Sequence, residues 1–189
     1  VLNKLAGHKI IGIMSHLPSA DSDSILTDQQ ISTFRETAGT FDLPLSIANS
    51  AAILDFPNSH LDWVRPGLML YGASPIDQLN TDLRASMTLS APIIAINKVV
   101  SGQSVGYGGT WVAQRDCLVA VLAAGYADGY PREIANGSVV LGGVRRDILG
   151  RVSMDMICVE LDESDDVTVG DQAILWGAGL PIEEVATTA

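Results

Sequence analysis

The sequence changes its pattern near residues 76–86, and this change is the strongest constraint on the fold. Before it, short apolar runs such as HKIIGIMSH (8–16) and LPLSIA (43–48) alternate with helical patterns. After it, strand-like runs follow one another and are separated by turn signals such as ANG, GG and VGD. The first pattern indicates βα units of a parallel sheet, and the second indicates an antiparallel, barrel-like β-domain. The polar stretch IDQLNTDLRAS between them predicts a linker, and we place the domains at 1–82 and 83–189.

Individual elements can be predicted within each part. In LTDQQISTFRETAG, Thr27 and Gln30 form a capping-box pattern and Gly39 marks a helix end. A second helix is predicted to begin at Leu180–Pro181. The predicted strands of the second part cover residues 88–100, 117–125, 138–143, 146–161 and 172–177.

Composition excludes several classes of protein. The chain has 189 residues, 47% of them hydrophobic, which is enough to bury the cores of one or two domains. With 11 Lys and Arg against 22 Asp and Glu, the net charge of -11 would repel a nucleic-acid backbone. No apolar run approaches the roughly 18 residues of a membrane span. Cys117 and Cys158 are too few for a disulfide framework and lack zinc-site spacing, which predicts reduced thiols in strands of a cytoplasmic protein.

Two positions in the first part are candidates for chemistry. His16 ends an apolar run, where a parallel-barrel enzyme keeps its reacting groups, although a structural histidine is the alternative. The acidic loop that follows, with Asp21 and Asp23, lacks the remaining ligands of a calcium loop, so we predict no metal site. Arg65 lies within an apolar run and must find an acceptor because it keeps its charge, either in a site or in a structural ion pair.

Asn49 and Ser50 stand at a predicted helix start, where hydroxyl and amide groups suit a phosphate. An ordinary N-cap is the alternative for this pair. Further along, VGYGGTW places Tyr107 between glycines, but it lacks the Lys-Ser/Thr ending of a nucleotide loop. GRVSMDMICVEL alternates like a strand, and that pattern alone assigns no function to its side chains.

Taken together and in order, these motifs resemble the pyridoxal-phosphate-dependent alanine racemases. The resemblance runs from IGIMSHLPSAD through ANSAA, DWVRPGLMLYG, VGYGGTW, GYADGYPR and GRVSMDMICVEL to LWGAGLPIEEVA. It implies an α/β plus β fold, namely the C-terminal part of a (β/α)8 TIM-type barrel followed by a β-rich domain. It also implies interconversion of L-alanine and D-alanine for cell-wall peptidoglycan, by a homodimer with shared active sites.

The resemblance assigns a role to each matching residue. Tyr107 corresponds to the catalytic tyrosine that exchanges the substrate α-proton on one face, and His16 and Arg65 correspond to its polar network. Arg65 corresponds to the arginine that faces the cofactor pyridine nitrogen, and a guanidinium donates a hydrogen bond there without giving up its proton. The remaining correspondences are a phosphate site at Ser50, Gly67 and Leu68, a carboxylate contact at Met154, and an entry channel at Tyr126, Arg151 and Asp155.

The chain departs from the family in four respects. The C-terminal tyrosine-bearing segment of the family is missing, so we expect the β-domain at 83–189 to be truncated at its C-terminal end. None of Lys4, Lys9 and Lys98 stands in a motif like that of the Schiff-base lysine, so the chain carries the tyrosine half of the site. A full barrel takes about 250 residues, and far fewer precede the linker, so we expect a fragment that is inactive alone. Ser46 stands where many relatives have histidine.

Two alternatives to a racemase remain. A related barrel-fold amino-acid decarboxylase would carry a cysteine-bearing motif in place of VGYGGTW. A non-catalytic piece that serves dimerisation would gain support from the missing lysine.

Overall fold

The structure is a computed structural model that describes residues 8–76, 82–162 and 164–189. The chain divides into two compact units, residues 1–84 and 85–189. The predicted linker at 76–86 falls partly on residues 77–81, which lie outside the described residues, as does Lys4.

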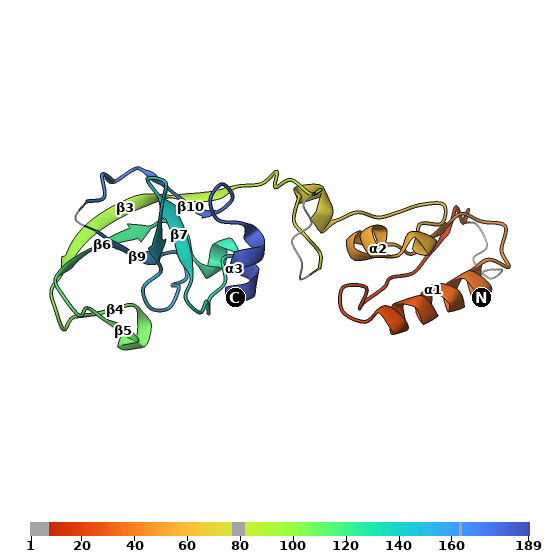
Figure 1. The fold of residues 1–189 in the computed structure, drawn as a ribbon, viewed down its shortest axis with the longest axis horizontal. Helices are drawn as coiled ribbons and strands as arrows, with labels where there is room; N and C mark the ends of the chain where they lie inside the picture. Colours follow the sequence, from red (N-terminus) through yellow and green to blue (C-terminus); the bar gives the residue numbers. More distant parts are fainter. Residues whose placement is uncertain (1–7, 77–81, 163) are drawn as a thin grey trace. The chain divides into compact units, whose positions relative to one another are not determined.

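The first unit repeats a strand followed by a helix (Figure 1). Strand β1 pairs in parallel with β2, and Ser46 at the end of β2 forms a parallel bridge to Trp63. Three successive chain segments therefore run in the same direction, as the sequence predicts for βα units. The elements are β1 (Ile13–Met14), α1 (Ser24–Ala38), β2 (Leu45–Ser46), α2 (Ser50–Asp55) and two 3-10 helices, η2 (Pro57–Ser59) and η3 (Leu68–Tyr71).

Helix α1 begins earlier than its predicted capping box. Asp23 is the N-cap, and its carboxylate accepts a hydrogen bond from the Leu26 N–H at 2.9 Å. Thr27 lies inside the helix, where its hydroxyl donates to the Asp23 carbonyl at 2.6 Å, so the prediction of a Thr27 cap is wrong. The predicted end is confirmed, because Gly39 is the C-cap and its N–H donates to the Arg35 carbonyl.

The core of the first unit lies between its strands and helices. Its fully buried members include Leu17, Ile31 and Ile47, and small alanines bring α2 close to the strands. This packing fixes the start of α2, which carries Ser50 at a buried position.

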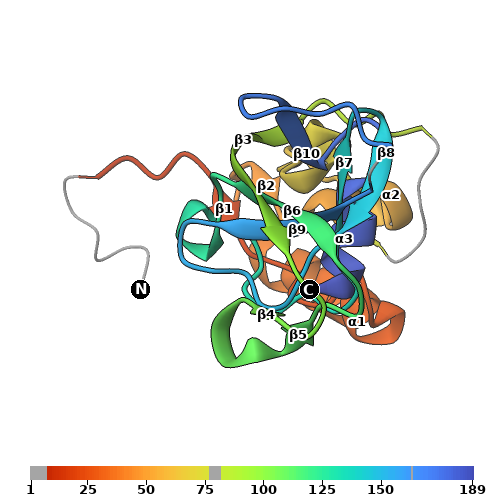
Figure 2. The same cartoon turned by 90° about the vertical axis from the view of Figure 1, so that its left-hand side faces the viewer.

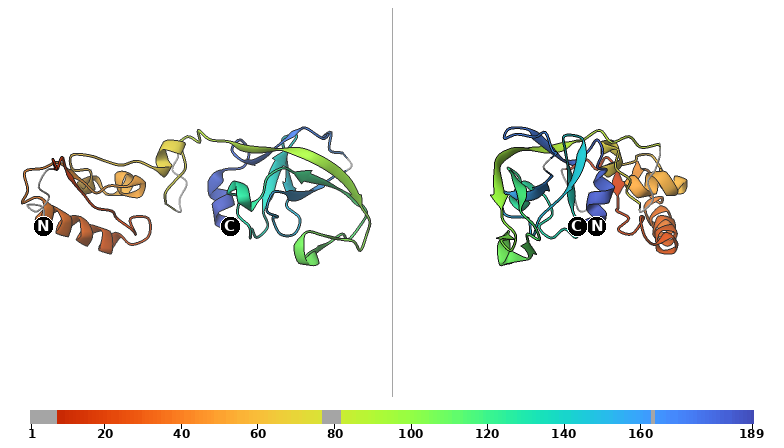
Figure 3. Two further views of the ribbon diagram at one scale, coloured as in Figure 1. Left: turned by 180° about the vertical axis from the view of Figure 1, so that it is seen from behind. Right: turned by 60° about the vertical axis from the view of Figure 1, so that its left-hand side comes forward.

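The second unit is an antiparallel sheet in the order β8-β7-β10-β3-β6-β9. A bridge between Ile148 and Val159 joins the regions of β8 and β9, so the two ends of this order meet. Register shifts in the pairings of β3 with β6 and with β10 help the sheet to curve around its core (Figures 2 and 3). The strands are β3 (Leu89–Val99), β6 (Cys117–Leu122), β7 (Ser138–Leu141), β8 (Val144–Asp147), β9 (Ile157–Leu161) and β10 (Gln172–Trp176).

Three further features of this unit bear on the predictions. A separate hairpin of β4 (Ser104–Val105) and β5 (Trp111–Val112) was not predicted. The predicted strand over 146–161 is wrong in its middle, because residues 148–156 form a loop between β8 and β9, with Gly150 at φ +67°. Helix α3 (Ile182–Thr188) begins after Pro181, as predicted, and buries Val185 against the barrel core.

Both cysteines are free thiols within strands, Cys117 in β6 and Cys158 in β9. Burial raises the pKa of each thiol, which disfavours the reactive thiolate. Across the described ranges, no helix has the length and apolar character that crossing a membrane requires. The same residues contain no group of three or more His, Cys, Asp or Glu side chains arranged to hold a metal ion.

Candidate active site

Tyr107 lies at the tip of the β4–β5 hairpin, on a short 3-10 turn, η4 (Tyr107–Gly109). Gly106, Gly108 and Gly109 adopt φ angles of 80°, 74° and 58°, in the left-handed region that other residues avoid. The Tyr107 side chain is 66% exposed. The glycines therefore form a turn that presents a phenol to its surroundings instead of packing it into a core.

The hairpin contacts the loop that precedes β9. A Cβ atom on Gly106 would lie 3.6 Å from the Arg151 backbone nitrogen, and one on Gly150 would lie 3.0 Å from the Val105 carbonyl oxygen. Backbone therefore packs on backbone here, and the absence of two side chains permits the close approach. This contact brings the Tyr107 turn next to Arg151.

The same loop holds the second tyrosine turn, η5 (Tyr126–Asp128). The Tyr126 N–H donates to the Ser153 carbonyl at 3.0 Å, and the Ala127 N–H donates to the Met154 carbonyl at 2.9 Å. Tyr126 and Met154 both remain exposed, at 39% and 57%. The loop at 150–156 thus contacts both tyrosine turns, and it carries the predicted residues Arg151, Met154 and Asp155 itself.

Arg132 is a neighbour of this group that the sequence reasoning missed. Its guanidinium carbon lies 5.4 Å from the centre of the Tyr126 ring, in cation–π geometry. Arg132 and Arg151 line one cleft of about 550 Å³ together with Thr110 and Glu133. In the sequence, the feature that points to Arg132 is its place in the Pro-Arg pair that directly follows GYADGY. The two guanidinium groups outnumber the single Glu133 carboxylate at this cleft, although the chain as a whole is acidic.

In the first unit, Arg65 is half-buried and held by neutral acceptors. Its Nη1 donates to the Ser46 hydroxyl at 2.7 Å, and its Nη2 donates to the Ser15 carbonyl at 2.7 Å. No carboxylate in the described part of the chain forms an ion pair with it. The alternative of a structural ion pair therefore finds no partner among these residues.

Ser50 is the first residue of α2 and is 6% exposed. Its hydroxyl accepts hydrogen bonds from the backbone N–H groups of Gly67 at 2.9 Å and Met69 at 3.4 Å. The preceding Asn49 is the N-cap, and its side chain accepts from the Ala52 N–H at 3.1 Å. Asn49 is therefore an ordinary N-cap. The Ser50 hydroxyl instead lies against the backbone of residues 67–69, a segment that includes the predicted Leu68.

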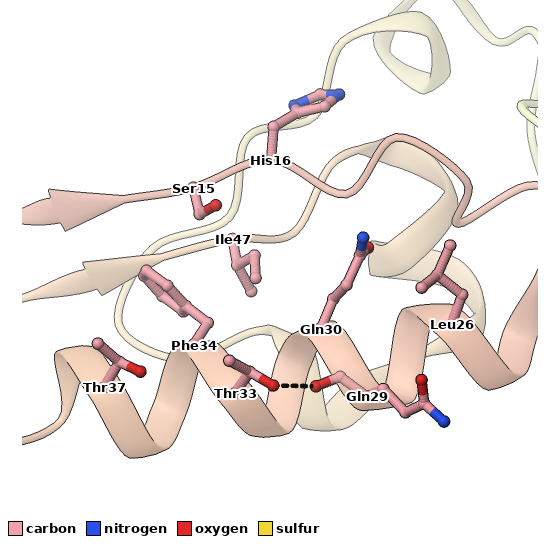
Figure 4. Close-up of a pocket in the computed structure, with 9 residues that line it drawn as sticks. All are labelled: Ser15, His16, Leu26, Gln29, Gln30, Thr33, Phe34, Thr37 and Ile47. Atoms are coloured by element: carbon pink, nitrogen blue, oxygen red, sulfur yellow. Dashed lines mark hydrogen bonds between the residues drawn. The ribbon is translucent and has the colours of Figure 1, made fainter.

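His16 is exposed and directly follows Ser15, whose carbonyl binds Arg65. Its ring points away from α1, whereas Ile47 points toward that helix (Figure 4). Within residues 8–76, no hydrogen bond joins the His16 ring to Arg65, so the two are linked through the Ser15 backbone. His16 also borders a pocket of about 490 Å³ between the strands and α1.

Comparison with known proteins gives both units the same assignment. The sequence model of the alanine racemase N-terminal domain matches residues 1–75, and that of the alanine racemase C-terminal domain matches residues 86–189. The chain belongs to the alanine racemase family. Its first unit is the C-terminal part of a (β/α)8 barrel, and its second unit is the family's β-rich domain.

Individual relatives agree with the family assignment. The chain is 46% identical over 188 residues to the biosynthetic alanine racemase of Pseudomonas aeruginosa, covering 95% of this chain and 52% of that protein. The crystal structure of biosynthetic alanine racemase from Pseudomonas aeruginosa superposes with a TM-score of 0.83 at 43% identity, covering 99% of this chain and 54% of that one. Alanine racemase from Bartonella henselae, solved with covalently bound pyridoxal phosphate, has a TM-score of 0.81 at 32% identity, covering 95% and 51%. The chain therefore spans about half the length of these relatives.

Proposed function

We propose that this chain is part of an alanine racemase that interconverts L-alanine and D-alanine with pyridoxal phosphate in the cytoplasm. The product D-alanine would supply cell-wall peptidoglycan. The observation that carries the proposal is the exposed Tyr107, held on a glycine turn against the Arg151 loop. A phenol presented in this way is available to a small substrate.

The first unit offers groups that fit the cofactor. A phosphate accepts several hydrogen bonds, and the Ser50 hydroxyl with the backbone N–H groups of Gly67 and Leu68 would donate them. In the structure the Gly67 N–H donates to the Ser50 hydroxyl oxygen at 2.9 Å, so these groups form one cluster. The Ser50 hydroxyl keeps its own proton for a phosphate, and the Gly67 N–H would exchange its serine acceptor for a phosphate oxygen. When bound, pyridoxal phosphate supplies an electron sink that makes the substrate α-proton more acidic.

Arg65 would face the pyridine nitrogen of the cofactor. A guanidinium keeps its proton in proteins, so it can only donate a hydrogen bond there. The ring nitrogen would then stay unprotonated, which limits side reactions such as decarboxylation and transamination. The neutral partners of Arg65 fit this role, because neither Ser46 nor the Ser15 carbonyl neutralises its charge.

Tyr107 would carry the α-proton on one face of the substrate. A free phenol has a pKa near 10, so a polar network must help it to accept a proton at neutral pH. His16 and Arg65 would supply that network. The base for the opposite face would be the Schiff-base lysine, which none of the lysines in this chain matches by motif.

The loop at 150–156 would bind the substrate. The Met154 carbonyl is used by Ala127, whereas the Met154 N–H has no partner among the described residues and would face the alanine carboxylate. Tyr126, Arg151 and Asp155 would form the entry channel. We add Arg132, because its guanidinium lies over the Tyr126 ring.

The test is Tyr107→Phe in the full-length protein. We expect loss of racemisation together with continued exchange of the α-proton in one enantiomer, because the base on the other face is intact. Deuterium uptake from D₂O into L-alanine and D-alanine, measured separately, distinguishes the two faces. Tyr71→Phe, which removes another exposed phenol from the first unit, is the matched control. Racemisation by Tyr107→Phe near the wild-type rate would show that another residue is the base.

We further propose a homodimer in which the second unit of one subunit completes the site of its partner. Mixing two inactive variants, Tyr107→Phe and Arg65→Ala, tests this arrangement. Under random pairing half of the dimers are mixed, and each mixed dimer holds one intact and one doubly altered site. About a quarter of wild-type activity should therefore return. Subunit exchange without any recovery would place the whole site within one chain.

A further inference from the structure

We propose that Ser46 is a positioning residue that fixes the orientation of the Arg65 guanidinium. The inference rests on the proposed function, because that function gives Arg65 an acceptor to face. It goes beyond that function by assigning a role to a side chain that would touch neither substrate nor cofactor.

Ser46 occupies the point where three neighbouring segments meet. It is the last residue of β2 and is 9% exposed. Its carbonyl accepts from the Ser15 N–H at 3.0 Å, on the side of β1. On the other side, it forms the parallel bridge to Trp63. Because the backbone is held on both sides, the Ser46 hydroxyl has a defined position.

The hydrogen-bond directions around this hydroxyl are determined by its partners. The Trp63 carbonyl can only accept, so the hydroxyl donates its single proton there, at 2.9 Å. The hydroxyl oxygen then offers a lone pair to Arg65 Nη1, at 2.7 Å. A guanidinium can only donate, so both contacts are satisfied at once. This arrangement leaves the hydroxyl with no spare proton that could compete with Arg65 for an external acceptor.

Two anchors from different chain segments orient the planar guanidinium. Nη1 is held by Ser46 on β2, and Nη2 is held by the Ser15 carbonyl just after β1. The Arg65 backbone is fixed separately, because its N–H donates to the Ala48 carbonyl at 3.0 Å. Among the described residues, the Nε–H and the second proton on each terminal nitrogen have no partner. These protons are the donors that remain for the ring nitrogen of the cofactor.

Removal of the hydroxyl should therefore release one end of the guanidinium. In Ser46→Ala, Nη1 loses its anchor, and Arg65 can turn about the single contact with Ser15. A misplacement of about 1 Å at a reacting site can lower the rate by about 100-fold, so a partial loss of orientation should cost at least about 10-fold. The charge of Arg65 is unchanged, so the effect would come from orientation.

The experiment compares four forms of the full-length protein: wild type, Ser46→Ala, Ser46→Thr and Ser59→Ala. Ser59 is a matched control, since it is fully buried and its hydroxyl donates to the Phe56 carbonyl at 2.7 Å, apart from Arg65. Each form is assayed for kcat and KM with alanine, for the pyridoxal phosphate dissociation constant and absorption spectrum, and for Tm.

We expect Ser46→Ala to lower kcat by at least about 10-fold, with KM changed by less than about three-fold, and to alter the cofactor spectrum. Ser46→Thr, which keeps a hydroxyl, should restore most of kcat, and Ser59→Ala should change Tm alone. If Ser46→Ala fails to fold, Ser46→Cys replaces it, because a thiol of similar size is a poor acceptor.

Wild-type racemisation together with a Ser46→Ala variant that matches Ser59→Ala in kcat and spectrum would overturn the inference. A wild type that binds pyridoxal phosphate without racemising alanine would instead contradict the proposed function. In that case the difference in spectrum between Ser46→Ala and Ser59→Ala still tests the positioning of Arg65.

Discussion

Gly125 is the residue at which a single added carbon should do the most local damage in the second unit. Its φ and ψ angles are -156° and -164°, an extended conformation that any residue adopts without strain. A Cβ atom there would lie 2.5 Å from the Asp155 backbone nitrogen and closer still to the carbonyl oxygens of Ser153 and Met154. All three are backbone atoms, so none can move aside as a flexible side chain would.

The expected cost of Gly125→Ala follows from the contacts that must separate. Overpacking of a tight contact costs about 1–3 kcal/mol. Separation of the turn from the loop also weakens the hydrogen bonds from Tyr126 to Ser153 and from Ala127 to Met154, each contributing about 0.5–1.5 kcal/mol. We expect a loss of about 2–6 kcal/mol in the free energy of unfolding.

Urea unfolding of the chain, followed by tryptophan fluorescence and circular dichroism, measures this loss. Gly129→Ala is the control in the same turn, because its Cβ would meet nothing within 4 Å, although its φ of +93° adds backbone strain of about 1–2 kcal/mol. Gly125→Ala should destabilise the chain more than Gly129→Ala. A larger loss of stability in Gly129→Ala than in Gly125→Ala would refute the reasoning, because backbone strain at residue 129 would then cost more than the close backbone contacts at residue 125.

Two further predictions concern the second unit. The Arg146 guanidinium holds the pKa of Asp165 below its ordinary 3.8, so this pair stabilises the fold above about pH 4, and that stabilisation is lost as the pH falls through the lowered pKa. Asp165→Asn should lower the free energy of unfolding by about 1.5–3 kcal/mol at pH 7, as measured by urea unfolding. The difference between the variant and wild type should shrink at acid pH, and a difference that does not depend on pH would contradict this prediction. The buried Tyr130 hydroxyl has no partner among the described residues, and burial raises its pKa to about 12. Tyr130→Phe should leave the free energy of unfolding unchanged or raise it by up to about 1 kcal/mol. The difference in ultraviolet absorbance between wild type and the variant should titrate near pH 12. A large destabilisation would instead show that the Tyr130 hydroxyl makes a hydrogen bond.

The sequence predicted the architecture where long patterns repeat. The apolar runs at 88–100 and 117–125 became β3 and β6, because burial of one face requires alternation over many residues. The β4–β5 hairpin was missed because each strand has two residues and glycines dominate its turn. The loop at 150–156 has the alternating sequence pattern of a strand. Its conformation depends on hydrogen bonds with the η5 turn, and the periodicity of the loop sequence does not reveal such contacts with another segment.

In the candidate site, likewise, some features could be predicted from the sequence and others could not. Motif order assigned Tyr107, Arg65 and Ser50 to roles, and those roles stay predictions. The partners of Arg65 could not be predicted, because the Ser46 and Ser15 contacts join three segments that are separated in the chain. Arg132 was missed because its contact with Tyr126 depends on the bend of the chain between them.

The meeting of β8 and β9 has a consequence for how the second unit associates with other chains. An open sheet edge offers unpaired N–H and C=O groups to which any extended chain can add, which favours aggregation. Here the bridge between Ile148 and Val159 joins the two ends of the sheet. Beside it, Arg146 on β8 pairs with Asp162 and Asp165, which follow β9 in the chain. Backbone addition at this seam is therefore disfavoured, and a partner that binds at the seam would have to use loops and side chains.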